Sequence, residues 1–85
     1  MDKMRYIIEI KPKAIKDGKK IPNNLLKRIF DKIEQLADDL QGDVKHLTNY
    51  TPEYRLRVGE YRVLFEIESN VISVYRIKHR RNAYR

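Results

Sequence analysis

The stretch YRLRVGEYRVLFEI, residues 54–67, contains three arginines: Arg55, Arg57 and Arg62. The apolar residues between them alternate as the buried side of a two-stranded hairpin does. Gly59-Glu60 fits a two-residue type II′ turn, which places Arg57 directly opposite Arg62. Like charges in this position destabilise a sheet, but guanidinium groups grip phosphate oxygens in a bidentate way. The stretch therefore predicts an anion site, against the alternative of a solvated face with hydrated arginines.

The C-terminal stretch IKHRRNAYR, residues 77–85, follows with more basic and aromatic side chains. If Ser69-Asn70 is also a two-residue turn, His79 and Tyr75 fall on the arginine face. Histidine has an ordinary pKa near 7 and suits proton transfer, although a lone histidine is often an ordinary surface residue. Tyr84 either packs at the terminus or stacks on a base. The candidate site consists of Arg55, Arg57, Arg62, His79, Arg80 and Tyr84, and Arg76, Lys78, Arg81 and Arg85 are candidates for further contacts to a bound polyanion.

One reaction suits this set of side chains. The sequence has no cysteine, no Gly-rich phosphate loop and no established metal motif, and its two histidines, His46 and His79, are far apart. We therefore expect chemistry without a metal or a cofactor. In RNA cleavage by the RNA's own 2′-hydroxyl, the protein only orients the nucleophile, stabilises negative charge on phosphorus and assists proton transfer.

The elements that must position these residues form a β-α-α-β-β-β pattern in a single domain, residues 1–85. Residues 5–10 alternate as a short strand, and Pro12 and Gly18 bound a short helix. Residues 22–41 carry an apolar stripe of helical period, with Gly42 as its stop. Residues 43–53 are predicted to be a connector, followed by the hairpin and a strand over 71–78. This pattern predicts an α+β fold, a mostly antiparallel sheet with two helices packed on one face.

The charge of the chain indicates the kind of partner. Its 85 residues carry a formal net charge of +7, which favours a polyanion such as nucleic acid, an acidic protein or an anionic membrane. There is no apolar run of membrane-spanning length and no signal-peptide pattern at the start of the sequence. With the lack of cysteine, this composition predicts a cytoplasmic protein.

Two blocks of the sequence, YRLRVGEYRVLFEI and HRRNAY, resemble the RelE/ParE superfamily of bacterial and archaeal toxins. The resemblance covers roughly residues 44–85; the N-terminal half agrees in its pattern of elements. It implies a ribosome-dependent endoribonuclease that cuts messenger RNA in the ribosomal A site, beside 16S rRNA, and leaves a 2′,3′-cyclic phosphate. It also implies a cognate antitoxin, which we expect to be an acidic chain that covers the basic face or displaces the C-terminal segment.

The resemblance also assigns roles to residues. Arg55 and Arg57 match the basic positions of the first hairpin strand, and Arg62 matches a transition-state stabiliser. Arg80 matches the arginine after the last strand, with Arg81 one residue away, and the C-terminal aromatic residue matches Tyr84. Two departures leave the general base and acid open: the spacing from Arg80 to Tyr84 is shorter than in the founding RelE type, and His79 precedes it.

Two other functions fit the same residues. One is a toxin of the ParE kind, which shares the fold but inhibits DNA gyrase without cutting nucleic acid. The other is a catalytically inactive RNA-binding relative, whose basic charge would give affinity through release of counterions.

Overall fold

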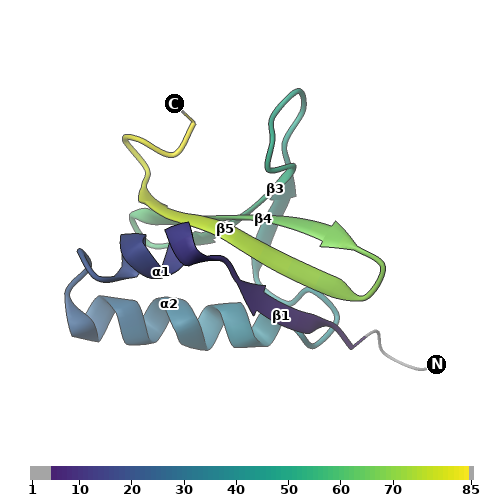
Figure 1. Cartoon of the computed structure of the whole chain (residues 1–85), viewed down its shortest axis with the longest axis horizontal. Helices are drawn as coiled ribbons and strands as arrows, with labels where there is room; N and C mark the ends of the chain where they lie inside the picture. The colour runs from purple at the N-terminus through teal and green to yellow at the C-terminus, as the bar shows by residue number, and fades with distance from the viewer. Residues whose placement is uncertain (1–4, 85) are drawn as a thin grey trace.

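The computed structural model describes residues 5–84, which form one five-stranded sheet and two helices (Figure 1). In chain order the elements are β1 (Ile7–Ile10), α1 (Pro12–Gly18), α2 (Asn23–Leu36), β2 (Asp43–His46), β3 (Tyr54–Val58), β4 (Tyr61–Glu68) and β5 (Val71–His79). The strand order is β1-β5-β4-β3-β2; β1 runs parallel to β5, and all other neighbours are antiparallel. The predicted α+β class is confirmed.

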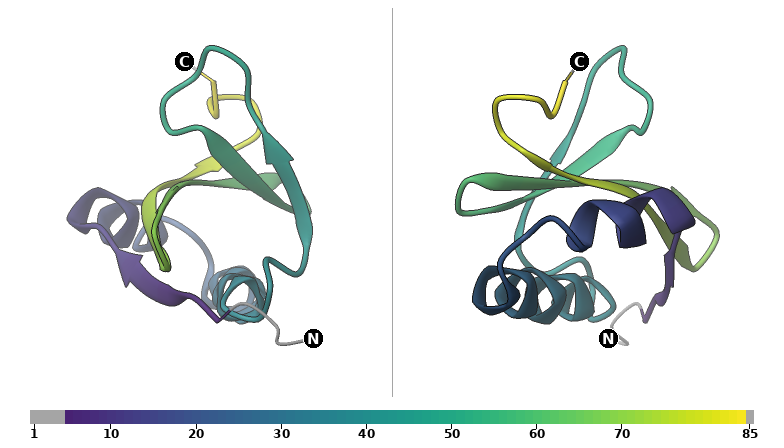
Figure 2. Two further views of the ribbon diagram at one scale, coloured as in Figure 1. Left: turned by 90° about the vertical axis from the view of Figure 1, so that its right-hand side faces the viewer. Right: turned by 60° about the vertical axis from the view of Figure 1, so that its left-hand side comes forward.

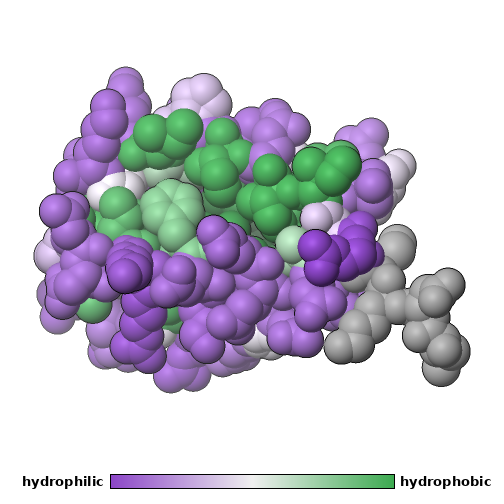
Figure 3. All heavy atoms as spheres, turned by 90° about the horizontal axis from the view of Figure 1, so that it is seen from below, coloured by the Kyte–Doolittle hydropathy of each residue, from purple (hydrophilic) through white to green (hydrophobic). Residues whose placement is uncertain are grey.

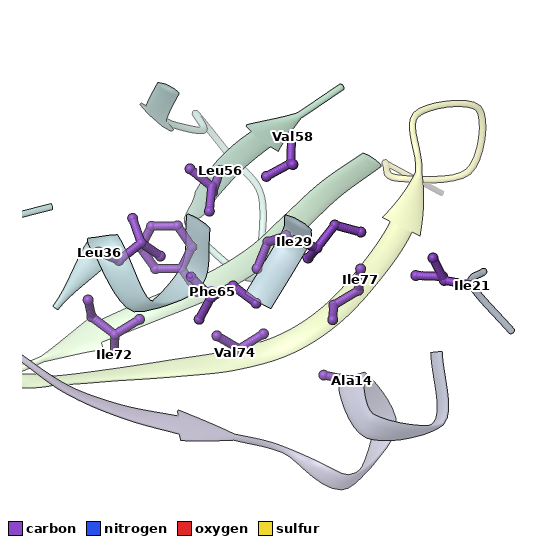
Figure 4. Close-up of a cluster of buried hydrophobic side chains, with 12 residues drawn as sticks. Ala14, Ile21, Ile29, Leu36, Leu56, Val58, Phe65, Ile72, Val74 and Ile77 are labelled. Carbon is purple, nitrogen blue, oxygen red and sulfur yellow. The ribbon is translucent and has the colours of Figure 1, made fainter. Parts of the chain in front are cut away.

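The core lies between α2 and one face of the sheet. Ile29, Ile33 and Leu36 of α2 are almost fully buried. They pack against side chains from β3, β4 and β5, among them Phe65 and Ile72 (Figure 4). The stripe of helical period in α2 meets the alternation of period two in the strands, which is what buries both apolar surfaces at once.

Both helices lie on the same side of the sheet. The loop between β2 and β3 and the C-terminal tail, residues 80–84, rise from the other side (Figure 2). We call that other side the outer face. On the helix side, Figure 3 shows a band of apolar side chains at the surface. Ile7, Ile15 and Leu25, on β1, α1 and α2, are the exposed large aliphatic residues within residues 5–84.

Part of the predicted connector is a strand. Asp43–His46 forms β2, with Val44 opposite Leu56 and Lys45 opposite Arg55 on β3. The connector prediction for these residues was wrong because DVKH offers one apolar residue, too few to show alternation. Short and charged strands of this kind are typical of sheet edges, where they discourage pairing with other chains.

The second helix is shorter than predicted. It ends at Leu36, and the Ala37 carbonyl accepts a hydrogen bond from the Tyr6 N–H at 2.9 Å. The predicted stop at Gly42 was wrong, since the chain has already turned through Asp39 and Leu40, both with positive φ. Leu40 still packs on the core, so its place in the apolar stripe extended the prediction beyond the helix.

Gly42 instead allows a close approach to the sheet. Its φ is 128°, and a Cβ at this position would lie 2.8 Å from Cδ1 of the buried Leu56. A residue without a side chain is therefore needed where the chain enters β2.

A β-bulge interrupts the pairing of β4 with β5. Both predicted two-residue turns are present: Gly59 has a φ of 56°, and Glu68 lies opposite Val71 across Ser69-Asn70. However, Leu64 pairs with Arg76 and Phe65 with Val74, so Tyr75 is an extra residue. The bulge shifts the alternation of β5 by one residue, which explains why its sequence alternates poorly.

Candidate functional site: two grooves on either side of the C-terminal tail

The predicted pairing of Arg57 with Arg62 is present in the sheet. Arg57 on β3 lies opposite Arg62 on β4, which in turn lies opposite Lys78 on β5. Neighbouring strands are about 4.8 Å apart, so these residues form a row roughly 10 Å long across three strands. We call Arg57, Arg62 and Lys78 the basic row.

Arg55 is neutralised by Asp43, which belongs to β2, the strand that was predicted to be part of a connector. Its Nη1 donates to the Asp43 carbonyl oxygen at 2.7 Å and to Asp43 Oδ1 at 3.1 Å. The Arg55 side chain is 14% exposed. Arg55 therefore ties β2 to β3 and contributes less free charge to the outer face than its position in the sequence suggests.

Arg57 and Arg62 keep their charge. Arg62 Nη1 donates to the carbonyl oxygens of Gly59 and Tyr61, each at 3.0 Å, which leaves the N–H groups of Nε and Nη2 for an anion. Arg57 is exposed. Within residues 5–84, neither side chain forms an ion pair. The turn carbonyls thus hold the Arg62 guanidinium in one orientation beside a free Arg57.

An open groove of about 490 Å³ lies over these arginines, and we call it the arginine groove. Its lining comes from β2, the loop after β2, β3, β4 and the tail: Lys45, His46, Leu47, Thr48, Tyr50, Arg55, Arg57, Arg62 and Tyr84. A groove with this lining can hold an anion on guanidinium and ammonium groups, with aromatic rings beside it.

The tail is held over the outer face by Tyr50. The Tyr50 hydroxyl donates to the Tyr84 carbonyl oxygen at 2.8 Å, and the two rings meet edge to face with their centres 5.5 Å apart. Beneath them, Leu64 of β4 and Ala83 of the tail are both buried and line one small cavity. This apolar contact on the outer face fixes the tail, which in turn places Tyr84 at the arginine groove.

His79 lies outside the arginine groove. The bulge puts it opposite Tyr61, with the ring centres 5.6 Å apart, in a second groove of about 390 Å³ on the other side of the tail. The expectation that His79 shares the arginine face was wrong, because it assumed uninterrupted alternation along β5. Arg80 is also elsewhere: its Nε lies 2.7 Å from Oε2 of Glu60 at the hairpin turn.

The residues expected to add RNA contacts divide as well. Lys78 belongs to the basic row and lines the second groove. Arg76 donates through Nε and Nη2 to the two carboxylate oxygens of Asp17, at 2.8 and 2.9 Å. Arg81 is exposed, and its backbone N–H donates to His79 Nδ1 at 3.3 Å. Arg85 lies outside the described residues.

Asp17 is held as a carboxylate. Burial opposes its ionisation, but hydrogen bonds from Arg76 and from the Ile77 N–H outweigh that effect and lower the pKa of the Asp17 carboxyl. The hydrogen bond to Asp17 likewise raises the pKa of Arg76. This pair attaches α1 to the edge of β5 that β1 leaves free, and it forms one wall of the second groove.

Sequence reasoning missed the contribution of β2 and the loop after it to the arginine groove. Lys45 lies beside Arg55, and His46 Nε2 is 3.5 Å from Oε2 of Glu53. Pairing residues 43–46 with the first hairpin strand would have brought both residues to the site. Tyr50 gave no such signal, because its place depends on the fold of an irregular loop.

Two further observations bear on the type of protein. Residues 5–84 contain no group of histidine, aspartate and glutamate side chains arranged to hold a metal ion. In the same range, no helix is long and apolar enough to cross a membrane.

Comparison of the sequence with known proteins gives consistent matches. A model of the family described as "ParE toxin of type II toxin-antitoxin system, parDE" matches residues 8–84. The chain is 36% identical to "Toxin RelE3" of Methanocaldococcus jannaschii, over 82% of this chain and 85% of that protein. It is 30% identical to "Putative toxin RelE1" of the same organism, over 96% and 98% respectively.

Solved structures agree with these matches. The fold is similar to the RelB–RelE antitoxin–toxin complex from Methanococcus jannaschii, with a TM-score of 0.73 and 31% identity over 86% of this chain and 91% of that chain. It is also similar to the archaeal RelE–RelB complex from Pyrococcus horikoshii OT3, with a TM-score of 0.75 and 25% identity over 94% and 100%.

Proposed function

The chain belongs to the RelE/ParE superfamily of type II toxin–antitoxin toxins, and from this premise we propose that it is an endoribonuclease that cleaves messenger RNA in the ribosomal A site. It would act in the cytoplasm, where translating ribosomes expose a codon beside 16S rRNA. The reaction would use the 2′-hydroxyl of the RNA as nucleophile and need no metal or cofactor.

The facing pair Arg57 and Arg62 is the observation that supports this proposal most strongly. A fold selected for stability alone would place opposite charges on facing strand positions, yet these two guanidiniums face each other without an acid between them. On its other side Arg57 faces Asp43 of β2, but Asp43 accepts a hydrogen bond from Arg55, and within residues 5–84 it forms no ion pair with Arg57. A bound phosphodiester would relieve the repulsion, because its two non-bridging oxygens can each accept from one guanidinium.

In the proposed reaction the arginine groove stabilises the charge that builds up on phosphorus. The 2′-oxygen attacks phosphorus, the bond from phosphorus to the 5′-oxygen breaks, and the products end in a 2′,3′-cyclic phosphate and a 5′-hydroxyl. Arg62 is already oriented by two carbonyl groups, so little reorganisation is needed when negative charge develops. Tyr84, at the edge of the groove, is placed to stack on a base.

Proton transfer needs a group other than arginine, which stays protonated in proteins. The arginine groove offers Lys45, His46, Tyr50 and Tyr84. His79, the candidate from the sequence, lines the second groove instead. We therefore propose that the proton acceptor belongs to the first set.

Replacing Arg62 tests the proposal. The variant Arg62→Ala should fold and yet lose codon-specific cleavage of messenger RNA in a translating extract, measured by primer extension. Arg28→Ala, which removes the same charge from an exposed position on α2, is the matched control and should cleave normally. Unchanged cleavage by Arg62→Ala would show that the arginine groove is not the reaction site.

A second candidate function is inhibition of DNA gyrase, the activity expected of a ParE-type toxin. The match of the family model named for ParE favours it, whereas the relatives of highest identity given above carry the name RelE. Expression of the protein in cells, followed by parallel measurement of translation and of plasmid supercoiling, separates the two. An early loss of supercoiling with intact messenger RNA would favour gyrase.

We also propose an acidic antitoxin as the partner that keeps this toxin inactive. The similar structures are complexes with RelB antitoxins, and the net charge of +7 favours an acidic chain. The antitoxin would cover Arg57 and Arg62 or displace the tail at Tyr84, and the apolar band on the helix side offers further contact area (Figure 3). Hydrogen exchange of the purified complex tests this; unchanged protection in both the tail and the groove strands would contradict it.

A further inference from the structure

The second groove has no part in the reaction proposed above. It runs along the edge of β5, between the chain that leaves α1 and the first residues of the tail. Its volume is about 390 Å³, and its lining includes Lys20 on one wall and Tyr61, Lys78, His79 and Asn82 on the other. It is open at the surface, so it can receive a group that belongs to a longer chain.

The charge of this groove is positive in spite of the carboxylate in its wall. Asp17 accepts from Arg76 Nε, Arg76 Nη2 and the Ile77 N–H, which occupies both carboxylate oxygens and balances its charge. Lys20 and Lys78 are left, and within residues 5–84 neither forms an ion pair. Two ammonium groups beside a neutralised acid favour an anionic ligand.

Neutral groups add the features of a nucleotide site. His79 Nδ1 accepts from the Arg81 N–H, so in the neutral ring the proton sits on Nε2, which donates to no other group within residues 5–84. Asn82 uses its backbone N–H in a hydrogen bond to the His79 carbonyl, and within residues 5–84 its side-chain amide has no hydrogen-bond partner. Tyr61 supplies an aromatic ring. The lysines can therefore bind the phosphate of a nucleotide, the His79 and Asn82 side chains can hydrogen-bond its sugar or base, and the Tyr61 ring can contact the base.

The basic row connects this groove with the arginine groove. Lys78 lines the second groove and is the strand neighbour of Arg62, which lines the first. The row is roughly 10 Å long by the strand spacing, which is about three nucleotides at the 3.4 Å per nucleotide of a stacked strand. The two grooves are therefore close enough for one RNA strand to occupy both, passing over the tail that lies between them.

We propose that the second groove binds a nucleotide that flanks the cleaved one, with its phosphate between Lys20 and Lys78. This inference rests on the proposed function, because it takes the ligand in the arginine groove to be RNA. The phosphate is the anion that both ammonium groups contact, and His79 and Asn82 hydrogen-bond the same nucleotide.

The test measures binding of a 2′-O-methyl RNA nonamer, which cannot be cleaved, by Lys20→Ala. Lys27→Ala on α2 is the matched control, since it removes the same charge from an exposed lysine away from both grooves. We expect Lys20→Ala to weaken binding about two- to fivefold at low salt. It should also reduce the salt dependence, log Kd against log salt, by about 0.7, the value for one phosphate contact on a single strand. Lys27→Ala should change neither.

Equal affinity and equal salt slopes for the two variants would overturn the inference. So would weaker binding of an acidic antitoxin peptide by Lys20→Ala with unchanged RNA binding, because the groove would then serve the protein partner. Neither result affects the proposed function, which depends on loss of cleavage in Arg62→Ala.

Discussion

Removing the Asp17 carboxylate should destabilise the protein more than any other change to an ion pair. Asp17 is 13% exposed and accepts three hydrogen bonds, two from Arg76 and one from the Ile77 N–H at 3.0 Å. A hydrogen bond to a charged group contributes about 1.5–3 kcal/mol, and a buried N–H left without a partner costs about 1–3 kcal/mol. Arg76 is one-third exposed, so water replaces part of the loss. We expect Asp17→Ala to lower the free energy of unfolding by about 2–3 kcal/mol.

Urea and thermal unfolding measure this effect directly. For a domain of this size, a loss of 2–3 kcal/mol lowers Tm by roughly 10–20 °C. Asp17→Asn is the informative second variant, since it keeps one oxygen for the Ile77 N–H while removing the charge, and it should lose about half as much. A loss below about 0.5 kcal/mol in Asp17→Ala would show that α1 is held to β5 by packing alone.

The pH dependence of the stability of the same variants tests whether the charge of Asp17 causes the loss. A carboxyl whose pKa is lowered by folding stabilises the fold at pH values above its ordinary pKa, and this contribution disappears as the pH falls through the folded-state value. The difference in stability between the unaltered protein and Asp17→Asn should therefore be constant above about pH 5 and shrink below about pH 4. A difference that stays constant down to pH 2 would refute the ion-pair explanation.

Three other substitutions have distinct expected outcomes. Arg57→Glu should abolish cleavage and leave the free energy of unfolding within about 0.5 kcal/mol of the unaltered protein, because the new acid faces Arg62 on β4 and Asp43 on β2; a change above about 1 kcal/mol in urea unfolding would contradict this balance. Gly42→Ala should cost about 2–3 kcal/mol by thermal unfolding, from the positive φ and the clash with Leu56; an unchanged Tm would mean that the backbone relaxes. Tyr50→Phe should lower stability by less than about 1 kcal/mol, loosen the tail in NMR relaxation and reduce cleavage, and a tail as rigid as before would remove Tyr50 from its holding role.

Features with a strong local sequence pattern could be predicted correctly, and features with a weak one could not. Strict alternation and a glycine turn were enough to place Arg57 opposite Arg62, and the structure has that register. The end of α2 was overestimated, since Leu40 continues the apolar stripe after the chain has left the helix. β2 was not predicted because its four residues include one apolar side chain, Val44, which cannot show an alternation.

The location of His79 could not be read from local sequence for a different reason. A bulge changes the face of every residue after it, and the sequence of β5 gives no position for the extra residue. This one bulge places His79 in the second groove and so divides the candidate residues between two grooves. The neutralisation of Arg55 by Asp43 depends likewise on a pairing between segments that are twelve residues apart.

The most direct test of the central claim is the chemistry of the RNA ends made by the purified toxin on programmed ribosomes. We expect cuts within the A-site codon, with a 2′,3′-cyclic phosphate on one fragment and a 5′-hydroxyl on the other, and no cuts with Arg62→Ala. Intact messenger RNA in the presence of folded toxin, or ends that carry a 5′-phosphate, would contradict the claim that this groove promotes attack by the RNA's own 2′-hydroxyl.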